Sequence, residues 1–368
     1  MNKILVFGVT DTAGGMESVI MNYYRNIDRN VIQFDFICNT EKVAYEDEII
    51  QLGGKIFRIT ARSKNYRKFK QDLKNFFKQH SKEYSTIWVN VCSLANIDYL
   101  IQAKKYGIKY RIIHSHNSKN MDSKLRGILH KINRLRIKKY ATDFWSCSDE
   151  ASEWFYSKKI INGSNYLLVN NAINTDKFKF NSEIRKKIRD ELNLNEYLVI
   201  GNVGRFHFQK NHKFIIEIFN ELLKINKNVK LILLGKGSKE QEIKARVKEL
   251  RIEKSVMFLG ERNDVQNVMQ AMDVLLFPSL FEGLPLTLVE AQANGMPILA
   301  SKDVISNKIK MSENLRFISL EETAEFWAKK LNEINLENKS KENIEIIKNV
   351  GFDIENESRK IEKYFLRN

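Results

Sequence analysis

The stretch Phe277-Pro-Ser-Leu-Phe-Glu282-Gly-Leu-Pro285-Leu-Thr-Leu-Val-Glu290-Ala-Gln-Ala-Asn-Gly-Met-Pro297-Ile-Leu-Ala-Ser301 decides the fold, because it predicts a strand, a loop, a helix, a turn and a second strand. Pro285 suits the opening turn of the helix, and Gly283 permits close approach of the backbone. The first backbone N–H groups of that helix, near Leu286 and Thr287, have no partner within it. A helix N-terminus of this kind is a ready anion-binding site.

Two carboxylates accompany this helix. Glu282 precedes it and Glu290 lies inside it, so the two are separated along the helix axis and can contact different parts of one ligand. On their own they indicate little. Glu282 could instead stabilise the helix dipole while Glu290 is solvated.

The same alternation of apolar runs and amphipathic stretches extends through the whole chain. In the first half the predicted strands are Lys3–Gly8, Ile32–Cys38, Lys55–Ile59, Thr86–Val91, Tyr110–His114, Phe144–Ser148 and Tyr166–Val169. In the second half they are Leu198–Val203, Lys230–Leu234, Val256–Leu259, Val274–Phe277 and Ile298–Ser301. Apolar strands separated by helices indicate parallel sheets that are covered on both faces.

The 368 residues are enough for two domains, each with its own core. We therefore expect an α/β protein of two doubly wound, Rossmann-like domains facing across a cleft: residues 1–175, joined by a C-terminal helix at 351–368, and residues 176–350. The segment Asn170–Phe178 would act as the hinge. Ligands of such sheets bind beyond the carboxyl ends of the strands.

Charge is distributed unevenly. The chain has 61 Lys and Arg against 45 Asp and Glu, a net charge of +16, and residues 1–170 hold 28 of these basic and 16 of these acidic residues. Two predicted amphipathic helices concentrate the excess, at 62–82 and at 119–139. For both helices one interpretation is a surface helix whose apolar stripe faces the core, with Tyr66, Phe69, Leu73 and Phe76 in the first stripe and Met121, Leu125, Ile128, Ile132 and Leu135 in the second.

The other interpretation is a surface for anionic lipid or nucleic acid, because each Lys or Arg near an anionic leaflet contributes on the order of 1 kcal/mol. No apolar run reaches the ~18 residues that span a bilayer. The first strand is also too short for the apolar region of a signal peptide. We expect a cytoplasmic protein, peripheral on the inner face of the cell membrane.

Five motifs occur in a characteristic order, each at the carboxyl end of a predicted strand. They are Gly14-Gly15-Met-Glu17, Gly201-Asn-Val-Gly204-Arg205-Phe-His-Phe-Gln-Lys210-Asn, Leu234-Gly-Lys-Gly237, Phe258-Leu-Gly260 and the Glu282-to-Glu290 segment. With them the chain resembles the retaining, nucleotide-sugar-dependent glycosyltransferases of family four, which have the GT-B fold. Arg111-Ile-Ile-His114-Ser-His116-Asn117 is similar to the members that build capsular polysaccharides, exopolysaccharides and related cell-surface glycans.

The resemblance implies roles for individual residues. Arg205 and Lys210 would bind the donor diphosphate, Glu282 the sugar hydroxyls and Glu290 the nucleotide ribose. Such cations stabilise the negative charge that grows on the leaving diphosphate. The remaining donor contacts would come from backbone and small residues of the surrounding loops, at Gly14, Gly15, Gly204, Glu261, Arg262, Gly283, Leu284, Pro285, Leu286 and Thr287. The sequence contains no D-x-D motif, so we expect transfer with no metal and no cofactor.

One position departs from the family pattern. Many relatives have a histidine just after the strand that corresponds to Thr86–Val91, facing the reacting sugar, where this chain has Asn90. His114 and His116 follow the next strand on one face and are the alternative catalytic candidates, although a structural role is open for each. The resemblance favours front-face attack without an enzyme nucleophile, so Glu282 would position and stabilise rather than attack.

The resulting prediction is a hexosyltransferase that moves a sugar from a UDP-sugar to a lipid-linked glycan precursor at an anionic membrane surface. One alternative is a cytosolic transferase that glycosylates a protein or a soluble acceptor. Another is a non-enzymatic nucleotide- or RNA-binding protein on the same scaffold.

Overall fold

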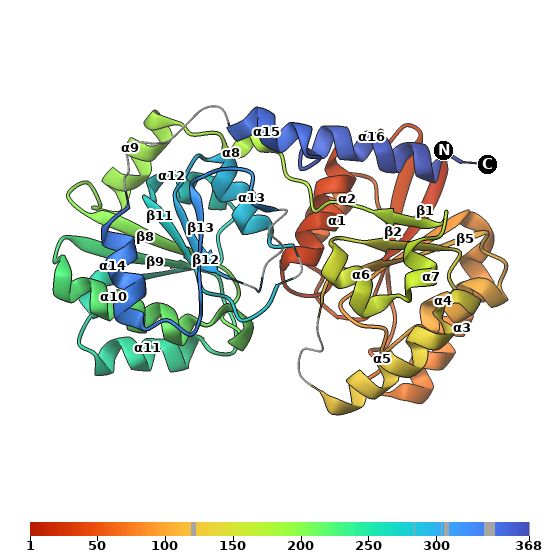
Figure 1. Cartoon of the computed structure of the whole chain (residues 1–368). Helices are drawn as coiled ribbons and strands as arrows, with labels where there is room; N and C mark the ends of the chain where they lie inside the picture. The colour runs from red at the N-terminus through yellow and green to blue at the C-terminus, as the bar shows by residue number, and fades with distance from the viewer. Residues whose placement is uncertain (119–122, 283, 303, 305–308, 335–342, 368) are drawn as a thin grey trace. The chain divides into compact units, whose positions relative to one another are not determined.

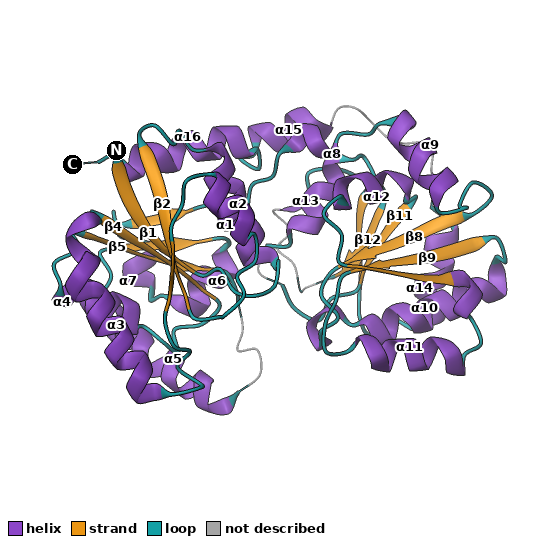
Figure 2. Ribbon diagram, turned by 180° about the vertical axis from the view of Figure 1, so that it is seen from behind, coloured by secondary structure: helices purple, strands orange, loops and turns teal. Residues whose placement is uncertain are grey.

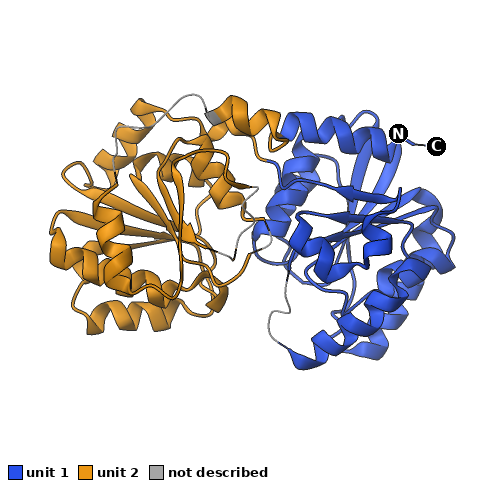
Figure 3. Ribbon diagram, in the orientation of Figure 1, with its two compact units in different colours: residues 1–172, 354–368 blue, residues 173–353 orange. Residues whose placement is uncertain are grey.

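The computed structural model describes residues 1–118, 123–282, 284–302, 304, 309–334 and 343–367. They form two compact units (Figure 3). Unit 1 consists of residues 1–172 and 354–368, and unit 2 of residues 173–353. Each is a parallel sheet with helices on both faces, as Figure 2 shows, which confirms the predicted fold class of two Rossmann-like domains.

Unit 1 contains a seven-stranded sheet in the order β3-β2-β1-β4-β5-β6-β7 (Figure 1). The strands are β1 Asn2–Phe7, β2 Ile32–Cys38, β3 Ile56–Arg58, β4 Thr86–Val91, β5 Tyr110–Ser115, β6 Asp143–Ser146 and β7 Tyr166–Leu168. All neighbouring pairs are parallel, so their carboxyl ends share one edge. The strand order reverses between β1 and β4, which places the switch point of this sheet after Phe7 and Val91.

Helices cover both faces of this sheet. They are α1 Gly15–Asn26, α2 Glu46–Gln51, α3 Tyr66–His80, α4 Asp98–Lys105, α5 Lys124–Arg136, α6 Asp149–Phe155, α7 Lys158–Ile161 and α16 Ile354–Phe365, with single 3₁₀ turns η1 Ser81–Glu83 and η2 Ile137–Lys139. On one face Trp88 of β4 contacts Tyr23 of α1 and Phe365 of α16. On the other face, Phe69 of α3 and Tyr99 of α4 belong to the hydrophobic core.

The last helix is part of unit 1 although it follows unit 2 in the chain. The Tyr364 hydroxyl donates to the Asp143 carboxylate at 2.6 Å, and Arg367 pairs with the same carboxylate at 2.6 Å. Ile354, Ile361 and Phe365 are buried and anchor the helix on this unit.

Unit 2 contains a six-stranded parallel sheet in the order β10-β9-β8-β11-β12-β13. The strands are β8 Leu198–Val203, β9 Val229–Leu234, β10 Val256–Gly260, β11 Val274–Phe277, β12 Ile298–Ser301 and β13 Leu315–Ile318. The helices are α8 Thr175–Phe178, α9 Ser182–Glu191, α10 His212–Ile225, α11 Glu240–Glu249, α12 Val265–Ala271, α13 Leu286–Ala293, α14 Ala324–Asn332 and α15 Asn343–Asn349, with 3₁₀ turns η3 Phe208–Lys210 and η4 Glu253–Ser255.

The twelve predicted strands are all present, each within two residues of its predicted ends. The edge strand β13 escaped prediction because it is short and carries the exposed Arg316 in its middle. No helix in the described ranges is long and apolar enough to cross a membrane.

Candidate active site

The switch point of the unit 2 sheet lies between β8 and β11, which are neighbours although β9 and β10 separate them in the chain. Ligand sites of parallel α/β sheets form at such a point, outside the carboxyl ends of the strands. The loop from Gly204 leaves β8 there, and the loop from Pro278 leaves β11. Two of the motifs predicted from the sequence therefore meet at one place.

Glu282 and Lys210 form an ion pair where the loops after β8 and β11 meet. The Lys210 ammonium donates to Glu282 Oε1 at 2.7 Å, and the amide of Gln209 donates to Glu282 Oε2 at 3.2 Å. The Glu282 side chain is only 7% exposed. Lys210 Nζ also lies 4.6 Å from the centre of the Phe277 ring. A nearly buried carboxylate is thus held by a cation and an amide, which is the arrangement a rigid binding site needs.

Backbone contacts fix Lys210 in this position. Asn211 takes a left-handed conformation with φ 55°, and its side chain donates to Pro278 O at 3.1 Å. The Leu280 N–H donates to Gln209 O at 2.8 Å. A Cβ on Gly204 would lie 3.2 Å from two carbons of the Lys210 side chain. Glycine at 204 therefore leaves room for the Lys210 stem.

The neighbouring loop needs glycine for a similar reason. Gly235, which follows β9, has φ +133°, and a Cβ there would lie 2.2 Å from Gly204 O. The loops after β8 and β9 thus approach each other more closely than a side chain allows.

Helix α13 begins at Leu286 after Pro285, and no side chain among the described residues caps its N-terminus. Leu284 and Thr287 are partly exposed beside it. Gly283 lies outside the described residues. An anion site at the start of this helix stays a prediction.

Glu290 lies one turn into α13, and removal from water raises the pKa of its carboxyl from 4.5 to about 7, an effect that Lys210 opposes. Lys210 therefore acts electrostatically on both glutamates of the motif. The structure brings Gly204, Lys210, Glu282 and Glu290 together.

The raised pKa of Glu290 predicts a pH-dependent stability. The native carboxyl holds its proton more tightly than the unfolded one, so its favourable contribution is fully present below about pH 4.5 and is lost as the pH rises through about 7. Because the side chain is partly exposed, the loss is at most about 3 kcal/mol. Glu290→Gln should therefore have a higher melting temperature than the wild type at pH 8 and a similar one at pH 5.

Glu249→Gln, which removes an exposed carboxylate of α11, is the matched control and should show no such pH-dependent difference. If the melting temperatures of Glu290→Gln and the wild type differed by the same amount at pH 5 and at pH 8, the raised pKa of Glu290 would be refuted.

Other predicted donor residues lie around this ion pair without joining it. The Arg205 side chain is exposed and forms no hydrogen bond or ion pair with any described residue. Glu261 is exposed beyond β10, after Gly260 with φ +65°. Arg262 forms two bonds of 2.7 Å with the carboxylate of Asp264.

Unit 1 holds the remaining candidates at the carboxyl edge of its own sheet. Gly14 precedes α1 and Gly15 opens it, and a Cβ on Gly15 would meet no atom of the described residues within 4 Å. Packing inside unit 1 does not require glycine at 15. Asn90, at the end of β4, donates to Phe7 O at 3.3 Å, and its Oδ1 lies 2.9 Å from His116 Nε2.

The two histidines differ in their surroundings. His114 is fully buried between Trp88, Trp145 and His116, and neither of its ring nitrogens has a partner in the described part of the chain. Burial lowers the pKa of both rings, that of His116 to about 3, so both are neutral near pH 7. The prediction that both histidines follow the strand is wrong for His114, which lies buried within β5, whereas His116 is partly exposed at the carboxyl edge beside Asn90.

Gln209 and Phe277 were not predicted as site residues. Both lie within the stretches quoted for their motifs, but an amide and a phenyl ring have no charge signal of their own. In the described residues, no group of three or more His, Cys, Asp or Glu side chains could hold a metal ion.

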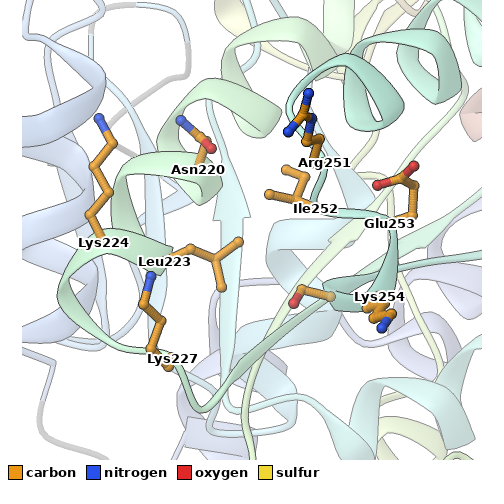
Figure 4. A pocket seen from close by; sticks show the side chains of 9 residues that line it. Asn220, Leu223, Lys224, Lys227, Arg251, Ile252, Glu253 and Lys254 are labelled. Atoms are coloured by element: carbon orange, nitrogen blue, oxygen red, sulfur yellow. The ribbon is translucent and has the colours of Figure 1, made fainter.

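A separate hollow of unit 2 lies at the opposite, amino-terminal edge of its sheet, where β9 and β10 begin (Figure 4). None of the predicted site residues lines it. Its lining residues are Asn220, Leu223, Lys224, Lys227, Arg251, Ile252, Glu253, Lys254 and Ser255.

Residues 184–349, which include the whole unit 2 site, match the protein family described as Glycosyl transferases group 1. This chain is a glycosyltransferase, and residues 184–349 form its domain of that group. It is 29% identical over 324 residues to the EpsF protein of Bacillus subtilis (strain 168), named as a glycosyltransferase, with 86% of this chain and 83% of EpsF covered.

The names of two further relatives state a product or an acceptor. The capsular polysaccharide biosynthesis glycosyltransferase CapH of Staphylococcus aureus is 24% identical to the glycosyltransferase described here, with 86% of this chain and 85% of CapH covered. The UDP-Gal:α-D-GlcNAc-diphosphoundecaprenol α-1,3-galactosyltransferase of Escherichia coli is 33% identical over 106 residues, which are 28% of this chain and 27% of that enzyme.

The fold agrees with the family. The crystal structure of Anabaena Alr3699/HepE in complex with UDP and glucose has a TM-score of 0.80 at 18% identity and covers 99% of both chains. The glycosyltransferase therefore has the GT-B fold that the resemblance implied.

Proposed function

We propose that this glycosyltransferase moves a sugar, with retention of anomeric configuration, from a UDP-sugar to a lipid-linked precursor of a capsular or extracellular polysaccharide. The observation that carries the proposal is the Lys210–Glu282 pair of 2.7 Å, beside the start of α13 and at the switch point of the unit 2 sheet.

Unit 2 would bind the donor. Lys210, Arg205 and the first N–H groups of α13 supply positive charge for a diphosphate, while Glu282 and Glu290 supply acceptors for sugar and ribose hydroxyls. These groups can stabilise a leaving diphosphate from protein atoms alone, so we propose that transfer needs no metal ion. The named ligand of the E. coli relative, UDP-Gal, favours a UDP-sugar as the donor.

Unit 1 would bind the acceptor. The E. coli relative acts on a diphosphoundecaprenol-linked sugar, and unit 1 carries most of the positive charge of this chain. A lipid-diphosphate acceptor suits both observations, and it places the enzyme on the inner face of the cell membrane. Asn90 and His116 at the carboxyl edge are the polar side chains that we assign to this reaction in unit 1.

The experiment combines purified protein, UDP-sugars and a lipid extract of bacterial membranes, and follows transfer of sugar into the lipid fraction. The product anomer is read by NMR. Transfer to the lipid with the donor's anomeric configuration supports the proposal. Transfer only to protein or to a water-soluble acceptor would overturn the assigned acceptor, and an inverted product would overturn retention.

Arg205→Ala tests the cationic role of the exposed Arg205. Because this exposed side chain forms no hydrogen bond or ion pair with another described residue, its removal should leave the melting temperature unchanged. We expect kcat and kcat/KM to fall together by about 10- to 100-fold, since the charge acts mainly in the transition state. A change in KM alone would show that Arg205 binds the donor equally in the ground state and the transition state.

A further inference from the structure

Helix α5 of unit 1 exposes its apolar side. Four residues, which we call the α5 apolar stripe, recur at steps of three and four and lie on one side of the helix. Their exposed fractions are 66% for Leu125, 56% for Ile128, 46% for Ile132 and 87% for Leu135. The stripe therefore does not face the core, and that interpretation of this helix was wrong for these four residues. Met121 lies outside the described residues.

The opposite side of α5 is buried, and the buried residues there are polar. The Leu94 N–H donates to His130 Nδ1 at 3.0 Å, and the Asn133 side chain donates to Leu94 O at 2.7 Å. The His130 ring also stacks on Trp154 with centroids 3.9 Å apart. These bonds fix the rotation of the helix about its axis, so it cannot turn its aliphatic residues inward without breaking them.

Positive charge borders the stripe. From 124 to 139 the sequence contains seven Lys and Arg and no Asp or Glu. Lys124, Lys131 and Lys138 are exposed and alternate with the stripe at steps of three and four. An aliphatic stripe framed by cations is typical of helices that lie in the interface of an anionic bilayer.

Helix α3 of the same unit shows that basic charge alone does not produce this arrangement. It too is rich in lysine, and Figures 1 and 2 show it on the same side of the sheet as α5. Its apolar residues Phe69, Leu73 and Phe77 are fully buried. For α3 the core-facing interpretation is correct for Phe69, Leu73 and Phe76, and it is wrong for Tyr66, which is 51% exposed.

We infer that α5 is a membrane-docking helix, which inserts the α5 apolar stripe among the acyl chains of an anionic leaflet while its lysines contact lipid phosphates. A second copy of this chain would bring the same positive charge against α5, and a nucleic acid would leave the aliphatic stripe uncovered. An anionic lipid surface satisfies both the charge and the apolar area. The inference rests on the proposed function in taking the acceptor to be a membrane lipid.

The test is flotation of the purified full chain with vesicles of phosphatidylcholine alone or with phosphatidylglycerol added. No donor or acceptor is present, so the result is independent of turnover. The wild type should float with the anionic vesicles, and less as salt is raised. The variant Leu125→Gln/Ile132→Gln/Leu135→Gln should lose most of this binding and keep its melting temperature, because the three side chains are exposed.

Matched charge variants separate α5 from general basicity. Lys124→Gln/Lys131→Gln/Lys138→Gln, on α5 and the η2 turn that follows it, removes three exposed charges, and so does Lys68→Gln/Lys74→Gln/Lys78→Gln on α3. At about 1 kcal/mol for each charge near the leaflet, the α5 variant should bind about 100-fold more weakly. The α3 variant should change binding less than tenfold.

Equal losses in the two charge variants would overturn the assignment to α5, and so would full binding by the stripe variant. Concentration-dependent dimers that disappear in the stripe variant, without vesicle binding, would show a second copy as the occupant instead. Salt-sensitive RNA binding with no vesicle binding would show a nucleic acid. The stripe variant is also assayed for sugar transfer to a lipid acceptor in detergent. This assay tests the proposed function separately from membrane docking.

Discussion

Glu282→Ala should lower sugar transfer by at least about a thousandfold while nucleoside diphosphate still binds, because the Glu282 carboxylate contacts the sugar and not the nucleotide in this account. The measurement is turnover of the preferred UDP-sugar together with calorimetric titration of UDP. Loss of UDP binding in parallel with activity would show that Glu282 organises the whole donor site.

Two further variants distinguish a loss of activity from a loss of folding. Removal of Glu282 leaves the nearly buried Lys210 ammonium without its partner carboxylate, and breaking such a pair can cost about 3–5 kcal/mol. Glu282→Gln keeps the shape and an acceptor oxygen, so it should fold and still lose most activity. Glu249→Gln should keep full activity, and wild-type activity in Glu282→Gln would refute the assignment.

Lys210→Ala should lower kcat by about 10²- to 10³-fold, because the ammonium stabilises the charge that develops on the leaving diphosphate. The substitution also removes the partner of Glu282 at 2.7 Å, so the position of that carboxylate is lost as well. Lys210→Arg should recover part of the activity, since it restores the charge with a different shape. Steady-state kinetics of the three proteins provide the measurement.

Lys239→Ala is the matched control, since Lys239 is an exposed lysine of the same unit that pairs with Glu242 at 2.7 Å. It should retain normal kinetics. If Lys210→Ala raised KM and left kcat unchanged, Lys210 would bind the donor equally in the ground state and the transition state, and its catalytic role would be wrong.

The fold was predictable because parallel strands that are buried on both faces appear in the sequence as continuous apolar runs. Ile4, Leu5 and Val6 are completely buried, as are Leu231, Ile232 and Leu233, and such continuous runs leave little choice of structure. The edge strand β13 lacks that signal, because Arg316 interrupts it.

The residue types of the candidate site were predictable as well, but not their contacts. Glycines and charged residues after Val203 and Phe277 indicated which loops meet, and the order of the strands brings them together. The bond between Lys210 and Glu282 could not be predicted, since it depends on the left-handed turn at Asn211 and on the space that Gly204 leaves.

Burial was harder to predict than topology. His114 and His116 are two apart and share a face, yet Trp88 and Trp145 enclose only the first, and these tryptophans come from other strands. Likewise the period of α5 predicted an amphipathic helix, but His130 and Asn133 decided which side faces inward. Periodicity identifies a side of a helix and does not say what covers it.

The central claim is that this chain is a glycosyltransferase that uses a nucleotide sugar, and donor turnover tests it most directly. Purified protein is incubated with UDP-, GDP-, ADP- and dTDP-sugars, with and without a membrane-lipid extract, in EDTA and separately in Mg²⁺. Release of UDP from a single donor in EDTA, stimulated by the lipid extract and absent in Glu282→Gln, is the predicted result. No nucleoside diphosphate release from any donor under any of these conditions would contradict the account.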